Sequence, residues 1–249
     1  MRIFIEIFVK AWYNEKNAMY VFEKVVLMRV RKRKNGDARR EALGDLILPF
    51  DRENIAPIDV KAIFPDKKSF RLEIGCGKGS FIRGMAEREP DVGFFAVELV
   101  ADVIVIAAEK IKNEKIENVR FLCCDAKYLG ELFPKDFFER IYLNFSDPWP
   151  KARHAKRRLT YHETLKGFAP LLAQDGLIEF KTDNRDLFDF SLEEFPMAGF
   201  VLQNVTNDLH ASEWAENNII TEYEANFSAK GFKINRLEAY LPEKTAKNS

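Results

Sequence analysis

Residues 73–79 read Glu-Ile-Gly-Cys-Gly-Lys-Gly, and this glycine-rich stretch decides the fold class. It follows a short apolar run, 70–74, and precedes a segment with helical spacing, 80–89, which ends at Pro90-Asp91. A strand, a glycine turn and a helix in this order are typical of the first unit of a parallel, doubly wound sheet. Glycines at such a turn permit positive φ and let a ligand come close to the backbone.

The same alternation continues downstream. Apolar runs typical of strands occur at 93–99, 119–124, 140–145, 177–181, 200–205 and 232–241. Helical spacing occurs at 100–114, 159–172 and 186–195. Strands separated by helices indicate an α/β, Rossmann-like fold with a mostly parallel, doubly wound sheet. The last two strands have no clear helix between them, so we expect an antiparallel strand at the far edge.

Composition narrows the class of protein. The chain has 249 residues, of which 39 are Lys or Arg and 39 are Asp or Glu, so its formal net charge is zero. This excludes a uniformly basic nucleic-acid binder but permits local basic patches. The apolar runs are far shorter than the ~20 residues of a membrane span, so we expect no membrane partner. Three cysteines, two of them adjacent, match neither a disulfide framework nor a metal site, and they favour a reducing, cytoplasmic compartment.

Three acidic residues follow the strands in a regular way. A dinucleotide-binding loop has the spacing G-x-G-x-x-G, so its third glycine comes one residue later than Gly79 does here. The carboxylate of Glu73, just before the loop, would also repel a pyrophosphate. Glu73 instead suits a cationic or amino-bearing ligand such as S-adenosylmethionine. Glu98 ends the second strand, where a carboxylate can accept hydrogen bonds from ribose hydroxyls, and Asp125 is placed to accept from an adenine amino group. The glycines Gly75, Gly77 and Gly79 complete this predicted cofactor site.

The segment after the fourth strand predicts a substrate site. It reads Asn-Phe-Ser-Asp-Pro-Trp-Pro at 144–150, with two prolines that fix the backbone and a tryptophan, Trp149, that offers a flat face for a base. Asp147 could accept hydrogen bonds from N1–H and the 2-amino group of guanine. Residues 151–158 then contain five basic residues, one histidine and no acid, which is typical of a phosphate-binding surface. A second basic run, 29–40, has little apolar content and is expected to be a flexible arm.

These motifs together resemble the bacterial tRNA (guanine-N7-)-methyltransferases. The resemblance covers about residues 28–241 and rests on EIGCGKG at 73–79, NFSDPWPKARHAKRRLTY at 144–161, FKTDNRDLF at 180–188 and TEYE at 221–224. It implies methyl transfer from S-adenosylmethionine to N7 of the guanine at position 46 in the tRNA variable loop.

The resemblance also implies roles for single residues. Asp147 would be catalytic and would line the cofactor site together with Glu73, Glu98 and Asp125. Substrate contacts would come from Lys151, Asp183, Thr221, Glu222, Tyr223 and Glu224. RNA contacts are expected from Lys151, Arg153, His154, Lys156, Arg157 and Arg158. Without the resemblance, residues 221–224 would be interpreted as a polar loop.

The chain divides by composition into four expected parts. Residues 1–27 form an atypical, aromatic-rich extension, and Met28 could be the functional start. A basic arm and lead-in, 28–68, precede the methyltransferase domain, 69–241, and a polar tail, 242–249, follows it. Residues 1–27 superficially suggest a signal peptide, but Glu6 and Lys10 interrupt their apolar run.

Other functions stay open from the sequence alone. The chain could methylate another RNA or an exocyclic amine, or it could be a non-catalytic RNA-binding module on the same fold. A nicotinamide-dependent oxidoreductase is disfavoured by Glu73 and by the early third glycine. The expected partner is tRNA, no metal is expected, and the protein could be a monomer or a homodimer.

Overall fold

The computed structural model describes residues 36–242, which all belong to one compact unit of the chain. The expected extension, 1–27, most of the expected basic arm and residues 243–249 of the polar tail lie outside these residues. At the described end of the arm, Arg39 lies in α1 (Gly36–Glu41). Its Nε donates to Glu109 Oε1 of α4 (Ala101–Asn113) at 2.6 Å. This end of the arm is therefore a packed helix, which differs from the flexible segment expected from its composition.

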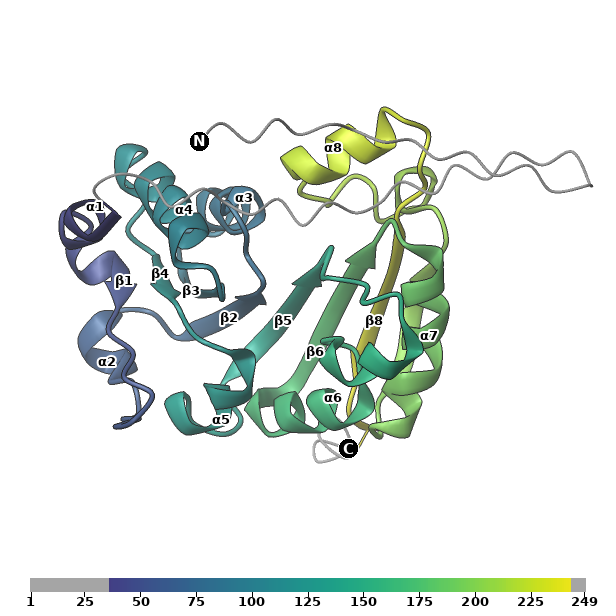
Figure 1. Ribbon diagram of the computed structural model, residues 1–249, viewed down its shortest axis with the longest axis horizontal. Coiled ribbons are helices and arrows are strands. Elements are labelled where there is room, and N and C mark those ends of the chain that lie inside the picture. Colours follow the sequence, from purple (N-terminus) through teal and green to yellow (C-terminus); the bar gives the residue numbers. More distant parts are fainter. Residues whose placement is uncertain (1–35, 243–249) are drawn as a thin grey trace, which may run out of the picture. The chain divides into compact units, whose positions relative to one another are not determined.

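An eight-stranded sheet runs through the described part of the chain (Figure 1). Its order is β1-β4-β3-β2-β5-β6-β8-β7. The strands are β1 (Ile47–Leu48), β2 (Ser69–Ile74), β3 (Val92–Val97), β4 (Val119–Leu122), β5 (Phe138–Asn144), β6 (Leu172–Thr182), β7 (Val201–Thr206) and β8 (Asn235–Tyr240). Every pair from β1 to β6 is parallel, and β8 is antiparallel to both of its neighbours. The mostly parallel, doubly wound fold is thus confirmed, with β8 as the antiparallel strand beside the edge strand β7.

Helices cover both faces of the sheet because side chains alternate along each strand. On β3, Phe94 and Ala96 pack with α3 (Ser80–Arg88) and α4, whereas Phe95 and Val97 pack into the opposite core. That opposite core contains residues of α5 (Leu129–Leu132), α6 (His162–Phe168) and α7 (Arg185–Met197). The short α2 (Val60–Ile63) lies before β2. Within residues 36–242, no helix has the length and apolar character that a membrane crossing requires.

Besides α1, the short β1, α2 and α5 were not expected from the sequence, and two further helices differ from the expectation. A helix was expected over 159–172, but α6 begins only at His162, because Tyr161 is extended and buried Glu194 accepts a hydrogen bond from the His162 N–H at 2.7 Å. The helix gives way to a 3₁₀ turn around Pro170, which lacks an N–H donor. No helix was expected at 222–228, yet α8 (Glu222–Ser228) forms there and lies beyond the carboxyl ends of β5 and β6 (Figure 1).

Candidate functional site

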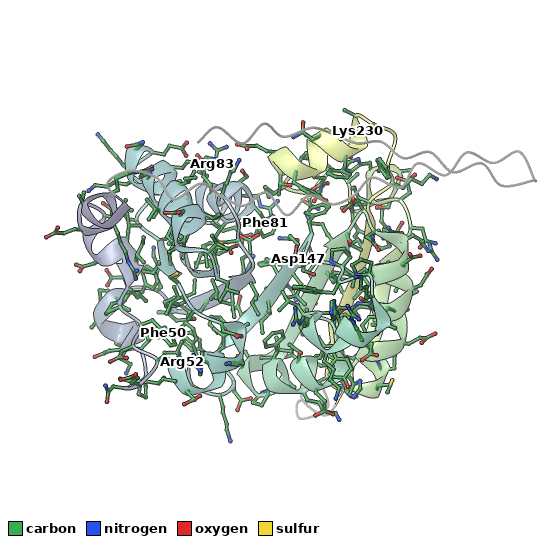
Figure 2. The ribbon with its side chains drawn as sticks, viewed as in Figure 1. Phe50, Arg52, Phe81, Arg83, Asp147 and Lys230 are labelled. Carbon is green, nitrogen blue, oxygen red and sulfur yellow. The ribbon has the colours of Figure 1, made fainter. Side chains whose placement is uncertain are left out.

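Acidic side chains lie at the carboxyl ends of the parallel strands, which together form the carboxyl edge of the sheet. Glu73 lies in β2, Glu98 follows β3, Asp125 follows β4, Asp147 follows β5, and Asp183 follows β6. Parallel strands end at the same edge, so all five carboxyl groups lie where such sheets bind ligands. Figure 2 shows Asp147 near the end of β5 at this edge. The fold therefore brings together the acids that the sequence analysis selected.

The glycine loop makes a tight turn between β2 and α3. Gly75, Gly77 and Gly79 all have positive φ, a backbone region that favours glycine. A Cβ atom at Gly79 would lie 2.8 Å from the Cβ of Ala107, so a larger residue would push α3 away from α4. Glycine is needed here both for the turn and for the close approach of the two helices.

Glu98 fastens the glycine loop to the end of β3. Its Oε2 accepts from the N–H of Gly77 at 3.1 Å, and its Oε1 accepts from the N–H of Val100 at 3.0 Å. The Gly77 N–H thus already donates to a carboxylate, whereas in a dinucleotide-binding site a loop amide of this kind would donate to a phosphate. Asp125, which is exposed, accepts from the N–H of Lys127 at 3.1 Å and pairs with its ammonium group at 3.6 Å.

Glu73 is buried beneath the loop. Its Oε1 accepts from the side-chain amide of Asn144 at 3.2 Å. Burial raises the pKa of Glu73 to about 7, although the Asn144 hydrogen bond and the positive charge of Lys181 act in the opposite direction. Oε2 of Glu73, Oδ1 of Asn144 and Oγ of Ser146 are buried and have no hydrogen-bond partner among the described residues. Three acceptor-capable oxygens are therefore left for a ligand that brings N–H or O–H donors.

The turn that carries Asp147 is held in a strained conformation. Phe145 has φ 51° and Trp149 has φ 42°, which are uncommon values for residues with a Cβ atom. The guanidinium group of Arg158 donates to the carbonyl oxygens of Pro148 and Trp149 at 2.9 and 3.1 Å. It also lies 4.1 Å from the centre of the Phe190 ring. Arg158 therefore supports the turn, and Asp147 remains exposed at its tip.

The rest of the basic segment forms a charged surface on a 3₁₀ helix, Ala152–Arg157. Its exposed cations are Lys151, Arg153, Lys156 and Arg157. Arg157 lies over the Trp149 ring at 4.9 Å, and the His154 ring meets Trp149 edge-on at 5.8 Å. Partial desolvation and the neighbouring cations lower the pKa of His154, so its imidazole is mostly neutral at pH 7. The structure thus separates Arg158, which is engaged within the fold, from four cations that face solvent.

Residues 221–224 begin α8 and lie against the same edge. The Thr221 hydroxyl caps the helix by accepting from the Glu224 N–H at 3.0 Å. The Tyr223 hydroxyl donates to Asp183 Oδ1 at 3.4 Å, and its ring packs on Phe145 with centroids 5.0 Å apart. Burial raises the pKa of both Asp183 and Tyr223. This segment is therefore joined to the turn that carries Asp147.

Glu222 and Glu224 point in different directions. Glu222 is exposed and pairs with Lys110 of α4 at 3.0 Å. Glu224 is fully buried and lies 3.4 Å from the ammonium group of Lys181. Sequence reasoning missed Lys181 and Asn144 as members of the site. Their signal was present in the motifs around 180–188 and 144–161, but a lysine in a strand gives no sign that it will be buried.

The arrangement fits a cofactor that is cationic and bears an amino group and a ribose. Glu73, Asn144 and Ser146 leave buried acceptors beside the loop, and Glu98 and Asp125 add carboxylates at the ends of the next two strands. A pyrophosphate would meet the carboxylate of Glu98 beside the loop and, above about pH 7, the ionised carboxylate of Glu73 as well. This set of hydrogen-bond acceptors therefore fits S-adenosylmethionine and disfavours a dinucleotide.

Comparisons with known proteins agree with this chemistry. A family model described as "Putative methyltransferase" matches residues 67–237. A "tRNA (guanine-N(7)-)-methyltransferase" of Brevibacillus brevis is 49% identical over 179 residues, covering 72% of this chain and 84% of that protein. A protein of the same name from Lachnoclostridium phytofermentans is 44% identical over 205 residues, covering 78% of this chain and 96% of that protein.

Solved structures resemble the fold at much lower identity. The crystal structure of the 16S rRNA methyltransferase KamB matches with a TM-score of 0.57 and 14% identity, over 78% of this chain and 95% of that one. An antibiotic-resistance methyltransferase, Kmr, matches with a TM-score of 0.54 and 17% identity, over 78% of this chain and 94% of that one. At this identity the likeness concerns the fold alone.

Proposed function

This chain belongs to the family of tRNA (guanine-N(7)-)-methyltransferases, and on that premise we propose that it methylates N7 of the guanine at position 46 in the tRNA variable loop. S-adenosylmethionine is the proposed methyl donor. The observation that carries the proposal is the buried carboxyl group of Glu73, whose Oε2 has no hydrogen-bond partner within residues 36–242 and lies beneath a glycine loop already tied to Glu98. That site selects a cationic donor and rejects a phosphate.

Five residues would hold the cofactor in this proposal. Glu73 and Asn144 would accept from its amino group, Glu98 would accept from its ribose hydroxyls, and Asp125 would accept from its adenine amino group. Asp147 would lie beside the reacting end. When bound, S-adenosylmethionine supplies a methyl group on a positively charged sulfur atom.

The target atom determines what the protein must do. Guanine N7 has a lone pair and no proton, so its methylation needs no general base. The new N7–methyl bond forms as the sulfur–methyl bond breaks, and the positive charge moves from sulfur to the base. Positioning of the two reactants can supply about 7–11 kcal/mol in favourable cases. Carboxylates of Asp147 and Asp183 would further stabilise the charge that develops on the base.

The tRNA substrate would bind at the same carboxyl edge of the sheet. Asp147 would lie beside the guanine at the reacting end, and Asp183 and residues 221–224 would border the base. Lys151, Arg153, Lys156 and Arg157 are exposed beside this edge and would bind phosphates. Trp149 would offer a ring to a neighbouring base. The proposed partner is therefore tRNA.

Methyl transfer to paired transcripts tests this proposal. Labelled S-adenosylmethionine is incubated with an unmodified tRNA transcript and with the same transcript in which the variable-loop guanine is adenine. We expect label in the first transcript only, released by chain cleavage specific for N7-methylguanine. Label in both transcripts would contradict position 46, and label that resists this cleavage would indicate methylation of another atom, such as an exocyclic amine. Cofactor binding without transfer to any tRNA would favour a non-catalytic RNA-binding module.

A further inference from the structure

The buried ammonium group of Lys181 lies between the start of α3, the turn that carries Asp147 and the segment 218–224. Lys181 of β6 has a fully buried side chain. Its Nζ lies 2.8 Å from Oδ1 of Asn218, 3.4 Å from the carbonyl oxygen of Ile219 and 3.4 Å from Oε2 of Glu224. Three acceptors thus match the three N–H donors of the ammonium group. All three acceptors come from the segment 218–224, which ends in the residues expected to border the substrate.

The same side chain contacts the cofactor side of the site. Its Nζ lies 4.9 Å from the centre of the Phe81 ring. Phe81, which Figure 2 labels, is in the first turn of α3 after the glycine loop. It lies 5.9 Å from the Phe145 ring, and the Phe145 N–H donates to the carbonyl oxygen of Lys181 at 2.8 Å. Its positive charge also acts on Glu73. Lys181 therefore joins the glycine-loop helix, the Asp147 turn and the segment 218–224.

Two other polar contacts of residues 217–222 are nearer the surface. Arg88 donates to the carbonyl oxygen of Asn217 at 2.7 Å, and Lys110 pairs with Glu222 at 3.0 Å. Such exposed contacts contribute little to stability because water and salt screen them. Lys181 makes buried contacts with the segment, where Glu224 Oε1 also lies 2.7 Å from His210 Nε2 and accepts from the side-chain amide of Asn218. Of these partners, Lys181 is the fully buried one that comes from the sheet.

We propose that Lys181 is a positioning residue for methyl transfer, which holds the segment 218–224 and the bound guanine in register with the methyl donor. The inference rests on the proposed function. A buried ion pair gives little net stability, since removing both charges from water costs about as much as their attraction returns. What the pair does impose is a fixed geometry between β6 and the segment 218–224. That geometry matters for a reaction whose rate depends on the alignment of two reactants.

Three variants test the proposal. Lys181→Met removes the ammonium group, and Lys181→Arg keeps a buried cation of different shape. Arg236→Met is the matched control, because Arg236 is also buried on the sheet and pairs with Glu179 at 2.7 Å and with Glu238. Each variant is examined by thermal unfolding, by hydrogen exchange of residues 217–228, and by the single-turnover rate with saturating enzyme and S-adenosylmethionine.

We expect Lys181→Met to slow single-turnover transfer about 100-fold, as a displacement of about 1 Å can do. The amides of 221–224 should exchange faster in this variant, and Lys181→Arg should show smaller changes of both kinds. Arg236→Met should lower the melting temperature yet keep the wild-type rate below it. A wild-type rate in Lys181→Met, or an equal loss in Arg236→Met, would overturn the positioning role.

The experiments distinguish a failure of the proposed function from a failure of the role proposed for Lys181. If the wild-type protein methylates no tRNA, the proposed function is wrong, and hydrogen exchange alone decides the role of Lys181. In that case unchanged exchange of 217–228 in Lys181→Met would refute the positioning role as well. If the wild type is active and Lys181→Met matches it, only the role of Lys181 is wrong.

Discussion

In the proposed function, Glu73 combines a structural cost with a role in binding the cofactor. Burial raises its pKa to about 7 from an ordinary value of 4.5, so the folded protein favours the protonated form. The stabilisation linked to that proton is fully present below pH 4.5 and is lost as the pH rises through about 7. Binding of a cationic ligand has the opposite dependence, because it needs the ionised carboxylate.

Substitution of Glu73 should separate these two effects. At pH 8 we expect Glu73→Gln to raise the free energy of unfolding by about 1–3 kcal/mol, at about 1.4 kcal/mol per unit of pKa shift. The same variant should weaken S-adenosylhomocysteine binding about 10- to 100-fold, since hydrogen bonds to charged groups contribute about 1.5–3 kcal/mol. Thermal unfolding and calorimetric titration measure the two quantities. Glu131→Gln, which changes an exposed carboxylate of α5, is the control. A loss of stability in Glu73→Gln at pH 8 would show that ionised Glu73 is not strained.

Two arginines in the basic segment should behave differently. Arg153 is exposed, and we expect Arg153→Gln to lower the slope of log affinity for tRNA against log salt by about 0.7–0.9, the value of one lost phosphate contact. Arg158 is engaged by two carbonyl oxygens and the Phe190 ring, so Arg158→Gln should leave the slope unchanged. It should instead lower the rate of transfer, because the turn that carries Asp147 loses its support. Filter binding from 50 to 300 mM salt measures the slopes, and equal slopes for the two variants would contradict this division.

At the scale of elements, α8 depends on Thr221, the residue that precedes it. The helix has seven residues, and isolated helices of this length are marginal. The Thr221 hydroxyl caps it, and removal of such a cap typically costs about 1 kcal/mol. We expect Thr221→Ala to raise KM for tRNA several-fold while the affinity for S-adenosylhomocysteine stays within twofold. Thr221→Ser keeps the hydroxyl and should behave as the wild type in steady-state kinetics. An unchanged KM in Thr221→Ala would show that packing alone holds α8.

α8 also shows where sequence-based prediction fails. The strands β2 to β6 were predicted because apolar runs, helical spacing and glycine turns agree with one another along 69–197. The acids at the sheet edge were predictable for the same reason, since strand order alone places them together. Residues 222–228 carry only a short apolar pair at helical spacing, Tyr223 and Phe227, whose rings stack 4.4 Å apart. Buried Glu224 also ties the helix to Lys181 and His210, at 3.4 and 2.7 Å. Contacts between residues this distant in sequence cannot be inferred from local periodicity.

At the scale of the whole molecule, the residues that form the apolar cores lie on the faces of the sheet, and those of the candidate site lie at its carboxyl edge. Its two apolar cores lie on opposite faces and include the large side chains of β2 to β6. The polar residues of the site lie at the carboxyl edge, beyond those cores. A ligand at this edge should therefore stabilise the fold by mass action without repacking either core.

Thermal unfolding with different ligands uses this property to identify the cofactor class. At a concentration 100 times its Kd, a ligand adds about 2.7 kcal/mol to the free energy of unfolding. For a domain of this size that corresponds to a rise in melting temperature of about 5–10 °C. We expect S-adenosylhomocysteine to produce such a rise, because Glu73, Glu98 and Asp125 can accept its amino and hydroxyl donors. A nicotinamide dinucleotide at the same concentration should produce none, since its pyrophosphate would face Glu73 and Glu98. A rise with the dinucleotide alone would overturn the assignment of the glycine loop, and Glu73→Gln should reduce the rise caused by S-adenosylhomocysteine.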